Sequence, residues 1–399
     1  MSLTITEKVK EWFKTHIKIP LGVKIAICVL PVVITALFYI LRPFRRVMDW
    51  AVTYVSGPIR KFFSLLTSFY PFALMEILCT AGVIFFIYYI IKSIRDTSRR
   101  RGKWKLLGKR LLPILVIAFY LWGTFCWLWS SGYHATGFAE KNGFINRGVE
   151  NEDLIAVTEF FAEKMNELSL EIERDEEGFI IFDRRQIFTD SRGIYRNISE
   201  EFPGLKGTLY PPKSMLYSWL MSITGYSGMY FALTGEAMIN TNPPGVYMPV
   251  TIAHEHAHQL GIFAEDEASF VGILASITSD NIAFQYAGYM SGYDYLSRAL
   301  AIADIDEYTR IQDTMTGECM FDRIQEFTYW AGVRESNTRI NFLDNILDAI
   351  MNTTKDTVDA VYDGFLKSND QEFGILSYGQ CTDLLVEYFK DKITEESLP

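Results

Sequence analysis

The chain has 399 residues, enough for a membrane region together with one or two folded domains. Residues 1–134 hold 19 Lys and Arg against 5 Asp and Glu, whereas the remainder holds 19 against 43. This split predicts a basic part against anionic lipid and an acidic part in solvent, and the acidic part argues against nucleic-acid binding.

Three apolar runs within residues 1–134 predict a membrane region. They cover about residues 25–41, 71–91 and 111–130, and each is about long enough to cross a bilayer. Basic residues follow the first run where a cleavage site of small residues would be expected. The first run is therefore predicted to be a membrane anchor rather than a cleaved signal peptide.

The segment between the first two runs and the end of the third have interfacial character. Residues 50–69 mix aromatic side chains with Arg60 and Lys61, which favours an interfacial amphipathic segment over a fourth span. Glu76 lies inside the second run. We expect it to lie near a helix end rather than to have a functional role. The third run ends in residues typical of an aromatic belt: Trp122, Trp127, Trp129 and Tyr133.

Basic residues also predict the topology. Five lysines precede the first run, and nine Lys and Arg fill residues 92–110 between the second and third runs. The positive-inside rule places both segments in the cytoplasm of a bacterial cell. Three spans then make residues 135–399 an extracytoplasmic domain. Cys319 and Cys381 could pair there, although two cysteines do not form a disulfide framework.

Residues 135–399 predict a mainly α domain with a little sheet, an α+β class. Helices are expected over Asp153–Glu173, over Lys213–Thr224 and from Pro249 to Leu260, with Gly261 as the stop. Met229–Asn240 is strand-like but interrupted, which indicates a bent strand or a hairpin. The pattern is helical from Asp266 onward, with breaks expected near residues 288–292, 317 and 368–379.

The helix over residues 249–260 carries the motif with the clearest chemistry. His254 and His258 are one helical turn apart, so both imidazoles can bind one Zn²⁺, and Glu255 can act as general base. A third ligand is needed, and Glu265 and Glu267 follow on the next predicted helix. His256 lies about 200° around the helix from His254 and is expected to pack rather than to bind metal.

Several short stretches carry a resemblance, and they occur in this order: Tyr70-Pro71-Phe72, Ser227-Gly228-Met229-Tyr230, Thr234-Gly235-Glu236-Ala237, residues 249–261, residues 265–270, Phe365-Leu366-Lys367-Ser368-Asn369 and Ser377-Tyr378-Gly379. From about Pro71 to its end the chain resembles an uncharacterised bacterial membrane family, a domain of unknown function placed among the gluzincin-type HExxH zinc peptidases. The resemblance implies a zincin/gluzincin-like fold with His254, His258 and a glutamate on zinc. Glu265 and Ala268 match an E-x-x-A-D pattern, with Ser269 where Asp is usual, and Glu267 remains the alternative ligand.

The expected reaction is peptide-bond hydrolysis by a membrane-anchored zinc metallopeptidase acting on a peptide or protein substrate. An extended substrate could pair with the strand near residues 229–240, although a hairpin that merely supports the helix is an alternative. A different class, an inactive peptidase-like sensor or scaffold, remains open, and a transporter is a weaker third reading. Candidates for an oxyanion donor lie downstream: Tyr286, Tyr289, Tyr293, Arg339 and Tyr378.

Overall fold

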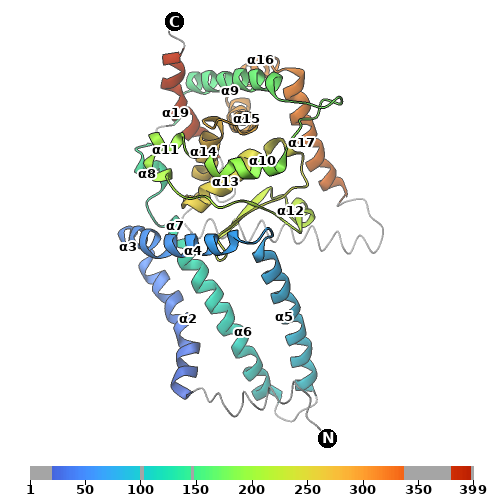
Figure 1. The fold of residues 1–399 in the computed structure, drawn as a ribbon. Coiled ribbons are helices and arrows are strands. Elements are labelled where there is room, and N and C mark those ends of the chain that lie inside the picture. Colours follow the sequence, from blue (N-terminus) through green and yellow to red (C-terminus); the bar gives the residue numbers. More distant parts are fainter. Residues whose placement is uncertain (1–19, 99–102, 145–147, 337–378, 397–399) are drawn as a thin grey trace. The chain divides into compact units, whose positions relative to one another are not determined.

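A computed structural model describes residues 20–98, 103–144, 148–336 and 379–396, and it is mostly helical (Figure 1). The chain divides into two compact units. Unit 1 comprises Met1–Pro43 and Ile84–Trp127, and unit 2 comprises Phe44–Val83 and Leu128–Pro399.

Unit 1 is built from long apolar helices: α2 (Leu21–Leu41), the greater part of α5 (Leu74–Ser98) and α6 (Lys103–Phe125). Among the described residues, three helices are long and apolar enough to span a membrane: Leu21–Leu41, Leu74–Thr97 and Gly108–Tyr133. They overlap the three predicted runs and indicate a membrane protein.

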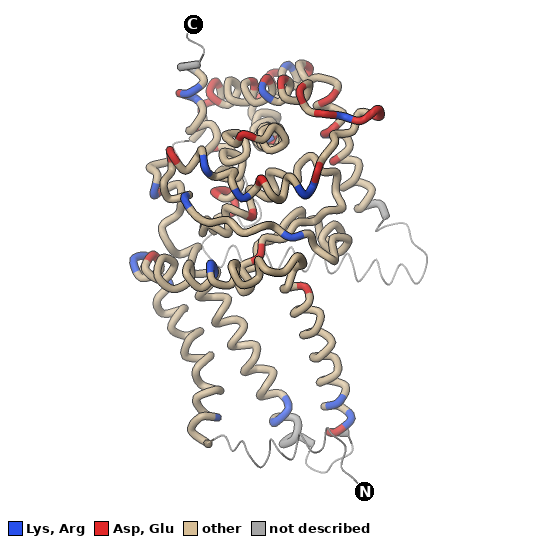
Figure 2. Tube along the Cα trace, viewed as in Figure 1, with Lys and Arg blue, Asp and Glu red and all other residues tan. Residues whose placement is uncertain are grey.

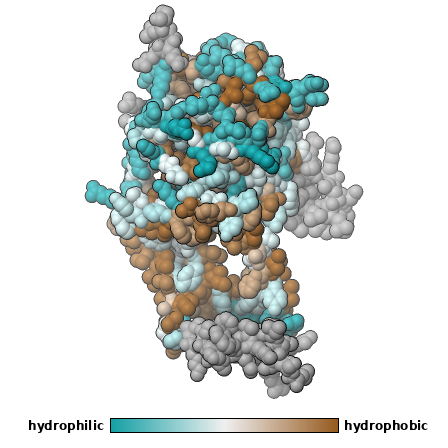
Figure 3. Space-filling model, viewed as in Figure 1, coloured by the Kyte–Doolittle hydropathy of each residue, from teal (hydrophilic) through white to brown (hydrophobic). Residues whose placement is uncertain are grey.

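The composition of these helices fits that reading. Along α2, α5 and α6 the charged residues are confined to the helix ends (Figure 2), and their surfaces are largely hydrophobic (Figure 3). Within unit 1, α2 and α6 approach closely at Gly123, where an added Cβ would lie 2.8 Å from Thr35 Oγ1. The indole of Trp127 donates to the Ile34 carbonyl at 3.0 Å, so this Trp joins two helices of the unit.

Unit 2 begins with a helical segment made of α3 (Arg45–Ala51), the π-helical turn η1 (Val52–Ser56) and α4 (Gly57–Ser68). Its polar side chains Ser56, Arg60, Ser64 and Thr67 are buried against the rest of the unit. Its large apolar side chains are exposed instead: Trp50, Tyr54, Phe62, Leu65, Leu66 and Phe69. The segment is amphipathic, as expected for residues 50–69, and its location at a bilayer surface stays a prediction.

A small sheet has the order β1-β3-β2, with β1 at Lys213–Ser214, β2 at Gly228–Phe231 and β3 at Glu236–Ile239. Strands β2 and β3 form an antiparallel hairpin in which Gly228 is opposite Ile239, so residues 229–240 form a hairpin rather than a bent strand. Strand β1 pairs with β3 in parallel, which leaves β2 at one edge.

The predicted helix over Lys213–Thr224 is wrong in its first half. Only α12 (Ser218–Thr224) is helical. Lys213 and Ser214 instead pair with β3, and the backbone N–H groups of Leu216 and Tyr217 donate to Glu76. A partner distant in sequence has satisfied these backbone groups, which is why the local pattern misled.

The remaining helices of unit 2 surround one apolar core. The longer ones are α9 (Asn151–Glu171), α13 (Met248–Leu260), α14 (Glu265–Ile277), α15 (Ile282–Ala303), α16 (Ile305–Gln312), α17 (Gly317–Ser336) and α19 (Gly379–Glu396). Short pieces connect them: α7 (Ser131–Tyr133), α8 (Phe138–Lys141), α10 (Arg184–Asp190) and α11 (Ile198–Glu201). The helices expected over residues 153–173 and 249–260 are confirmed. Cys319 and Cys381 are buried free thiols.

The predicted break near residues 288–292 is wrong, because α15 runs through it. The two glycines serve close packing rather than a turn. A Cβ added at Gly288 would lie 2.8 Å from Ser276 Cβ, and one added at Gly292 would collide with the Phe161 ring. A helix does begin at Gly317. Of the break expected over residues 368–379, residues 368–378 lie outside the described part of the chain.

Candidate metal centre

The helix that carries the motif is held in place at its C-terminal end. Gly261 adopts a left-handed conformation with φ +103°, and Ile262 N–H donates back to Ala257 O at 3.0 Å. This αL turn ends α13 where glycine is favoured. It also brings the carbonyl of Ile262 to the His258 ring, whose Nδ1 lies 2.8 Å away. The same turn therefore stops the helix and orients one imidazole.

A second helix, α14, crosses α13 at close range. Gly272 permits this approach, because a Cβ at that position would lie 2.9 Å from the backbone nitrogen of His254. Glu265 is the first residue of α14, where the helix dipole favours a carboxylate. The crossing carries Glu265 to the two histidines of α13.

His254, His258 and Glu265 form one cluster, in which a donor atom of each residue lies within 4.8 Å of the others. Glu265 Oε2 is 3.2 Å from His254 Nε2 and 3.5 Å from His258 Nε2. The His258 and Glu265 side chains are 5% exposed and that of His254 is 19% exposed, so the cluster opens on the His254 side. Two nitrogens and one oxygen at this separation match the protein ligands of catalytic zinc.

The charges of the cluster depend on one another. Burial alone lowers the pKa of His258, but the nearby Glu265 carboxylate outweighs it and raises the pKa to about 9. Burial alone raises the pKa of Glu265, but His258 and His254 hold it well below its usual range. The imidazoles and the carboxylate thus favour opposite charges in one another, so Glu265 stays ionised in this cluster.

Glu255 lies beside this cluster and is itself buried. Its Oε2 has no hydrogen-bond partner among the described residues. Burial raises the pKa of the Glu255 carboxyl to about 7. Strand β2 passes against it, because a Cβ on Gly228 would lie 2.5 Å from Glu255 Oε1 and 2.8 Å from Thr251 Cγ2. Only glycine allows this approach, and the resemblance had included Gly228 without giving it a role.

Ser269 occupies the place where the related pattern usually has Asp, and it still contacts a ligand histidine. Its Oγ is 3.2 Å from His254 Nδ1. The hydroxyl of Tyr295 donates to Ser269 Oγ at 3.2 Å. With Ser269 on His254 and Ile262 on His258, both Nδ1 atoms are engaged and both Nε2 atoms are directed at Glu265, an orientation typical of metal-ligating histidines.

Two residues near the motif point elsewhere. His256 Nε2 lies 3.1 Å from Ser191 Oγ, and burial lowers the pKa of His256 to about 3. The Glu267 carboxylate accepts the N–H groups of Phe138 and Ala139, each at 2.8 Å, and so caps α8. Glu265 and Glu267 are two positions apart and face in different directions. Of the two candidate third ligands, only Glu265 lies in the cluster.

Aromatic and basic side chains surround His258, and the sequence did not predict them. The ring of Trp129 makes an edge contact with the His258 ring at a centroid distance of 5.2 Å. Arg60 is buried, donates to the His258 carbonyl at 3.0 Å and lies over the Phe263 ring at 4.7 Å. The sequence predicts Trp129 in an aromatic belt and Arg60 in an interfacial amphipathic segment. No local pattern distinguishes these roles, because the contacts span more than 120 residues.

Other candidates lie away from the cluster. Glu76 accepts two backbone N–H groups and Tyr286 donates to Asp322 in the core, so both have structural partners. Tyr293 donates to Gln312. Arg339 and Tyr378 lie outside the described residues.

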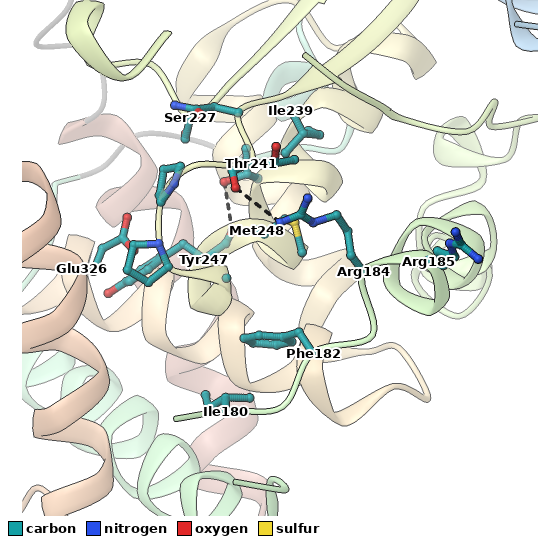
Figure 4. A pocket seen from close by; sticks show the side chains of 15 residues that line it. Ile180, Phe182, Arg184, Arg185, Ser227, Ile239, Thr241, Tyr247, Met248 and Glu326 are labelled. Carbon is teal, nitrogen blue, oxygen red and sulfur yellow. Dashed lines mark hydrogen bonds between the residues drawn. The ribbon is translucent and has the colours of Figure 1, made fainter. Parts of the chain in front are cut away.

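A cavity of about 500 Å³ adjoins the first half of α13 (Figure 4). Its lining includes Ser227, Thr251 and Arg184, which donates to the Thr241 carbonyl at 3.4 Å. Ser227 precedes the glycine that touches Glu255, and Thr251 lies one turn before Glu255. Two lining residues are thus near neighbours of groups that approach Glu255, although neither Glu255 nor any residue of the cluster is part of the lining.

The chain belongs to the family described as "Protein of unknown function (DUF3810)", which it matches over residues 52–386. This agrees with the uncharacterised family expected from the sequence. No curated protein and no solved structure matches the chain. An assignment to the gluzincin-type peptidases therefore depends on the residues of the site itself.

Proposed function

We propose that the protein is a membrane-anchored zinc metallopeptidase of the gluzincin type. The observation that carries this proposal is the convergence of His254 Nε2, His258 Nε2 and Glu265 Oε2, with a buried Glu255 beside them. The helix α13, its glycine stop and the edge strand β2 next to Glu255 support a zincin-like arrangement.

The residues fit zinc in both donor type and surroundings. Two imidazole nitrogens and one carboxylate leave a tetrahedral ion one open position, as a catalytic site requires. A second indication is that Glu255 Oε2, next to the cluster in the chain, has no hydrogen-bond partner within the described part of the chain, whereas a buried polar atom usually has one. His254, His258 and Glu265 would hold the ion.

When bound, zinc would act as a Lewis acid toward a peptide carbonyl and increase the acidity of a nearby water. Glu255 accepts the proton of the attacking water and then delivers it to the leaving amine. Burial keeps bulk water from the Glu255 carboxylate. Gly228 has no side chain and so leaves room for this carboxylate beside β2. Glu255 is therefore the catalytic residue, and Ser269 is a positioning residue for His254.

Strand β2 supplies the substrate side of the site. It lies at the edge of the sheet, so an extended peptide can add to it through backbone hydrogen bonds. The cavity beside Ser227 and Thr251 would receive a substrate side chain. The substrate is thus an extended segment of a peptide or protein.

We expect the domain carrying the site to lie outside a bacterial cell membrane, because basic residues flank the candidate spans on the side assigned to the cytoplasm. A reporter fused after Pro399 that is active only outside the cytoplasm is the expected result. Reporter activity confined to the cytoplasm would contradict this orientation and would leave the proposed chemistry unaffected.

Metal analysis of the purified full-length chain tests the proposed function. About one Zn²⁺ per chain is expected, together with peptide hydrolysis that a chelator removes and added zinc restores. A chain without transition metal would refute the metal site. A chain that holds zinc but has no chelator-sensitive hydrolysis would favour the inactive sensor or scaffold.

A further inference from the structure

Helix α12 and the residue pair before it expose large apolar side chains on the metal-bearing unit. Leu216 is 59%, Trp219 is 55% and Leu220 is 43% exposed. Three exposed large apolar side chains within five residues are unusual on a water-soluble face and indicate a site of interaction. The contacts around α12 identify what that surface meets.

Helix α12 is fixed to the first turns of α5. The Glu76 carboxylate of α5 accepts the N–H groups of Leu216 and Tyr217, each at 2.8 Å. One turn later, the hydroxyls of Thr80 and Tyr217 are hydrogen-bonded at 3.0 Å. All of these residues belong to unit 2. Because Glu76 is buried, these contacts fix the level of α12 along α5.

The sheet is also connected to α5, through the carboxylate of Glu236. Glu236 of β3 accepts the N–H groups of Leu74 and Met75 at 2.8 and 2.9 Å, and so caps the start of α5. Lys213 of β1 donates to Glu236 at 2.6 Å. Glu76 therefore links α5 to α12, and Glu236 links α5 to the sheet. Together the two carboxylates hold α12 against the first turns of α5.

The same turns of α5 are apolar on their outer side. Ile77, Leu78 and Val83 are 42%, 54% and 57% exposed, and they lie within the candidate span Leu74–Thr97. The exposed side chains of α12 are thus held at the level where a span enters the hydrocarbon. A bilayer that meets α5 at this level is continuous with the surface of α12.

Helix α4 gives a second, independent indication of the same level. Ser64 and Thr67 donate to the carbonyls of Gly235 and Thr234, in the turn between β2 and β3. The outward side of α4 is apolar, with Phe62 60% exposed, and Figure 3 shows hydrophobic surface along this edge of unit 2. The turn after the C-terminal end of β2 is therefore attached to α4, and the N-terminal end of β2 comes soon after α12 in the chain.

We infer that α12 is a membrane-interfacial helix, with Leu216, Trp219 and Leu220 in the boundary between the lipid headgroups and the acyl chains. Tryptophan is enriched at this depth because its ring is apolar and its N–H is polar. Leucine side chains gain from leaving water there. The inference depends on α5 spanning a bilayer and does not depend on the metal or on peptidase activity. It places the edge strand β2 beside the membrane surface.

Nitroxide labels at Leu216→Cys and Leu220→Cys, in the full chain reconstituted in phospholipid nanodiscs, test this contact. Cys28 and Cys79 are replaced by serine beforehand, and the same chain without an added cysteine measures labelling of the three buried native thiols. Ile302→Cys is the matched control, because Ile302 is an aliphatic residue of α15 that is 90% exposed, and Figure 1 shows α15 well apart from the first turns of α5.

At positions 216 and 220, collisions with oxygen should exceed collisions with a water-soluble nickel complex by several-fold relative to position 302, because oxygen partitions into lipid. A ratio equal to that at position 302 would show water at α12 and overturn the inference. Low collision rates with both reagents would show that protein covers the helix, and this would overturn it as well.

Discussion

Two of the buried polar clusters of unit 2 differ in how their charges are satisfied. Beside the sheet, Lys213 donates to Glu236 at 2.6 Å and to the Thr67 carbonyl at 2.7 Å, and Glu236 accepts two backbone N–H groups as well. At α13 and α14, two imidazoles converge on the single carboxylate of Glu265, and a second carboxylate, Glu255, has an oxygen without a described partner.

This difference leads us to expect a structural role for the first cluster, whereas the proposed function gives the second cluster a role in metal binding. Burying a charge is costly unless it is paired and hydrogen-bonded, so a cluster that satisfies itself needs nothing more. A buried carboxylate oxygen without a partner among the described residues is consistent with a ligand, an ion or a water at that place. Substitutions in the first cluster should therefore reduce stability, whereas those in the second should reduce metal binding or turnover.

The largest effect is expected for Glu255→Gln. The amide has the shape of the carboxylate but cannot accept the proton of water, so kcat should fall by about 10²–10⁴-fold. Zinc content should stay at the level of the unchanged chain, because Glu255 is outside the ligand cluster. Peptide turnover and metal analysis on the same preparation measure both quantities. Full turnover in this variant would remove Glu255 from the mechanism.

The next largest effect is expected between Glu265→Ala and Glu267→Ala. Each variant removes one carboxylate, and the two carboxylates point in different directions. Loss of Glu265 removes a ligand and should lower zinc affinity by more than about 100-fold, above the range for residues that merely orient ligands. Loss of Glu267 should leave zinc affinity unchanged. Its cost is the cap on α8, about 1 kcal/mol of unfolding free energy. Zinc titration that ranked the two variants in the opposite order would reassign the third ligand.

Lys213→Met tests the structural cluster. Removing one partner of a buried ion pair costs about 3–5 kcal/mol, and the low end is expected because Glu236 keeps its two backbone donors. A lower melting temperature with unaltered zinc affinity is the expected result. The exposed pair Lys164–Glu167 supplies the control, since Lys164→Met should change stability by less than about 0.5 kcal/mol. Loss of zinc in Lys213→Met would show that the two clusters are coupled.

The sequence predicted the parts of this comparison that depend on local spacing. Three features of the site are local and follow from the helix period. They are the four-residue interval between His254 and His258, the glycine stop at Gly261, and the different directions of Glu265 and Glu267. The apolar runs were found for the same reason, because a span must be continuous.

The missed features depend on contacts between distant segments. Glu76 lies in the first turn of α5, near a helix end as expected, but its backbone partners at residues 216 and 217 were not predicted. Lys213 was predicted to begin a helix, and its strand pairing depends on a partner far away in the chain. The glycines of α15 suggested a break because local sequence cannot show that a neighbouring ring needs the space. Long-range packing overrode local propensity at each of these positions.

The smallest effect is expected for Ser269→Ala. Ser269 Oγ contacts His254 Nδ1 at 3.2 Å and accepts from Tyr295, so it orients the imidazole without binding metal itself. Removal of such a contact lowers metal affinity by about 10-fold, the low end of the usual range, because a neutral hydroxyl holds the ring less firmly than a carboxylate. Ser276→Ala is the matched control on the same helix, since the Ser276 hydroxyl donates to the Gly272 carbonyl and to no ligand. Zinc titration should separate the two variants, and equal affinities would mean that the contact between Ser269 and His254 does not orient the ligand.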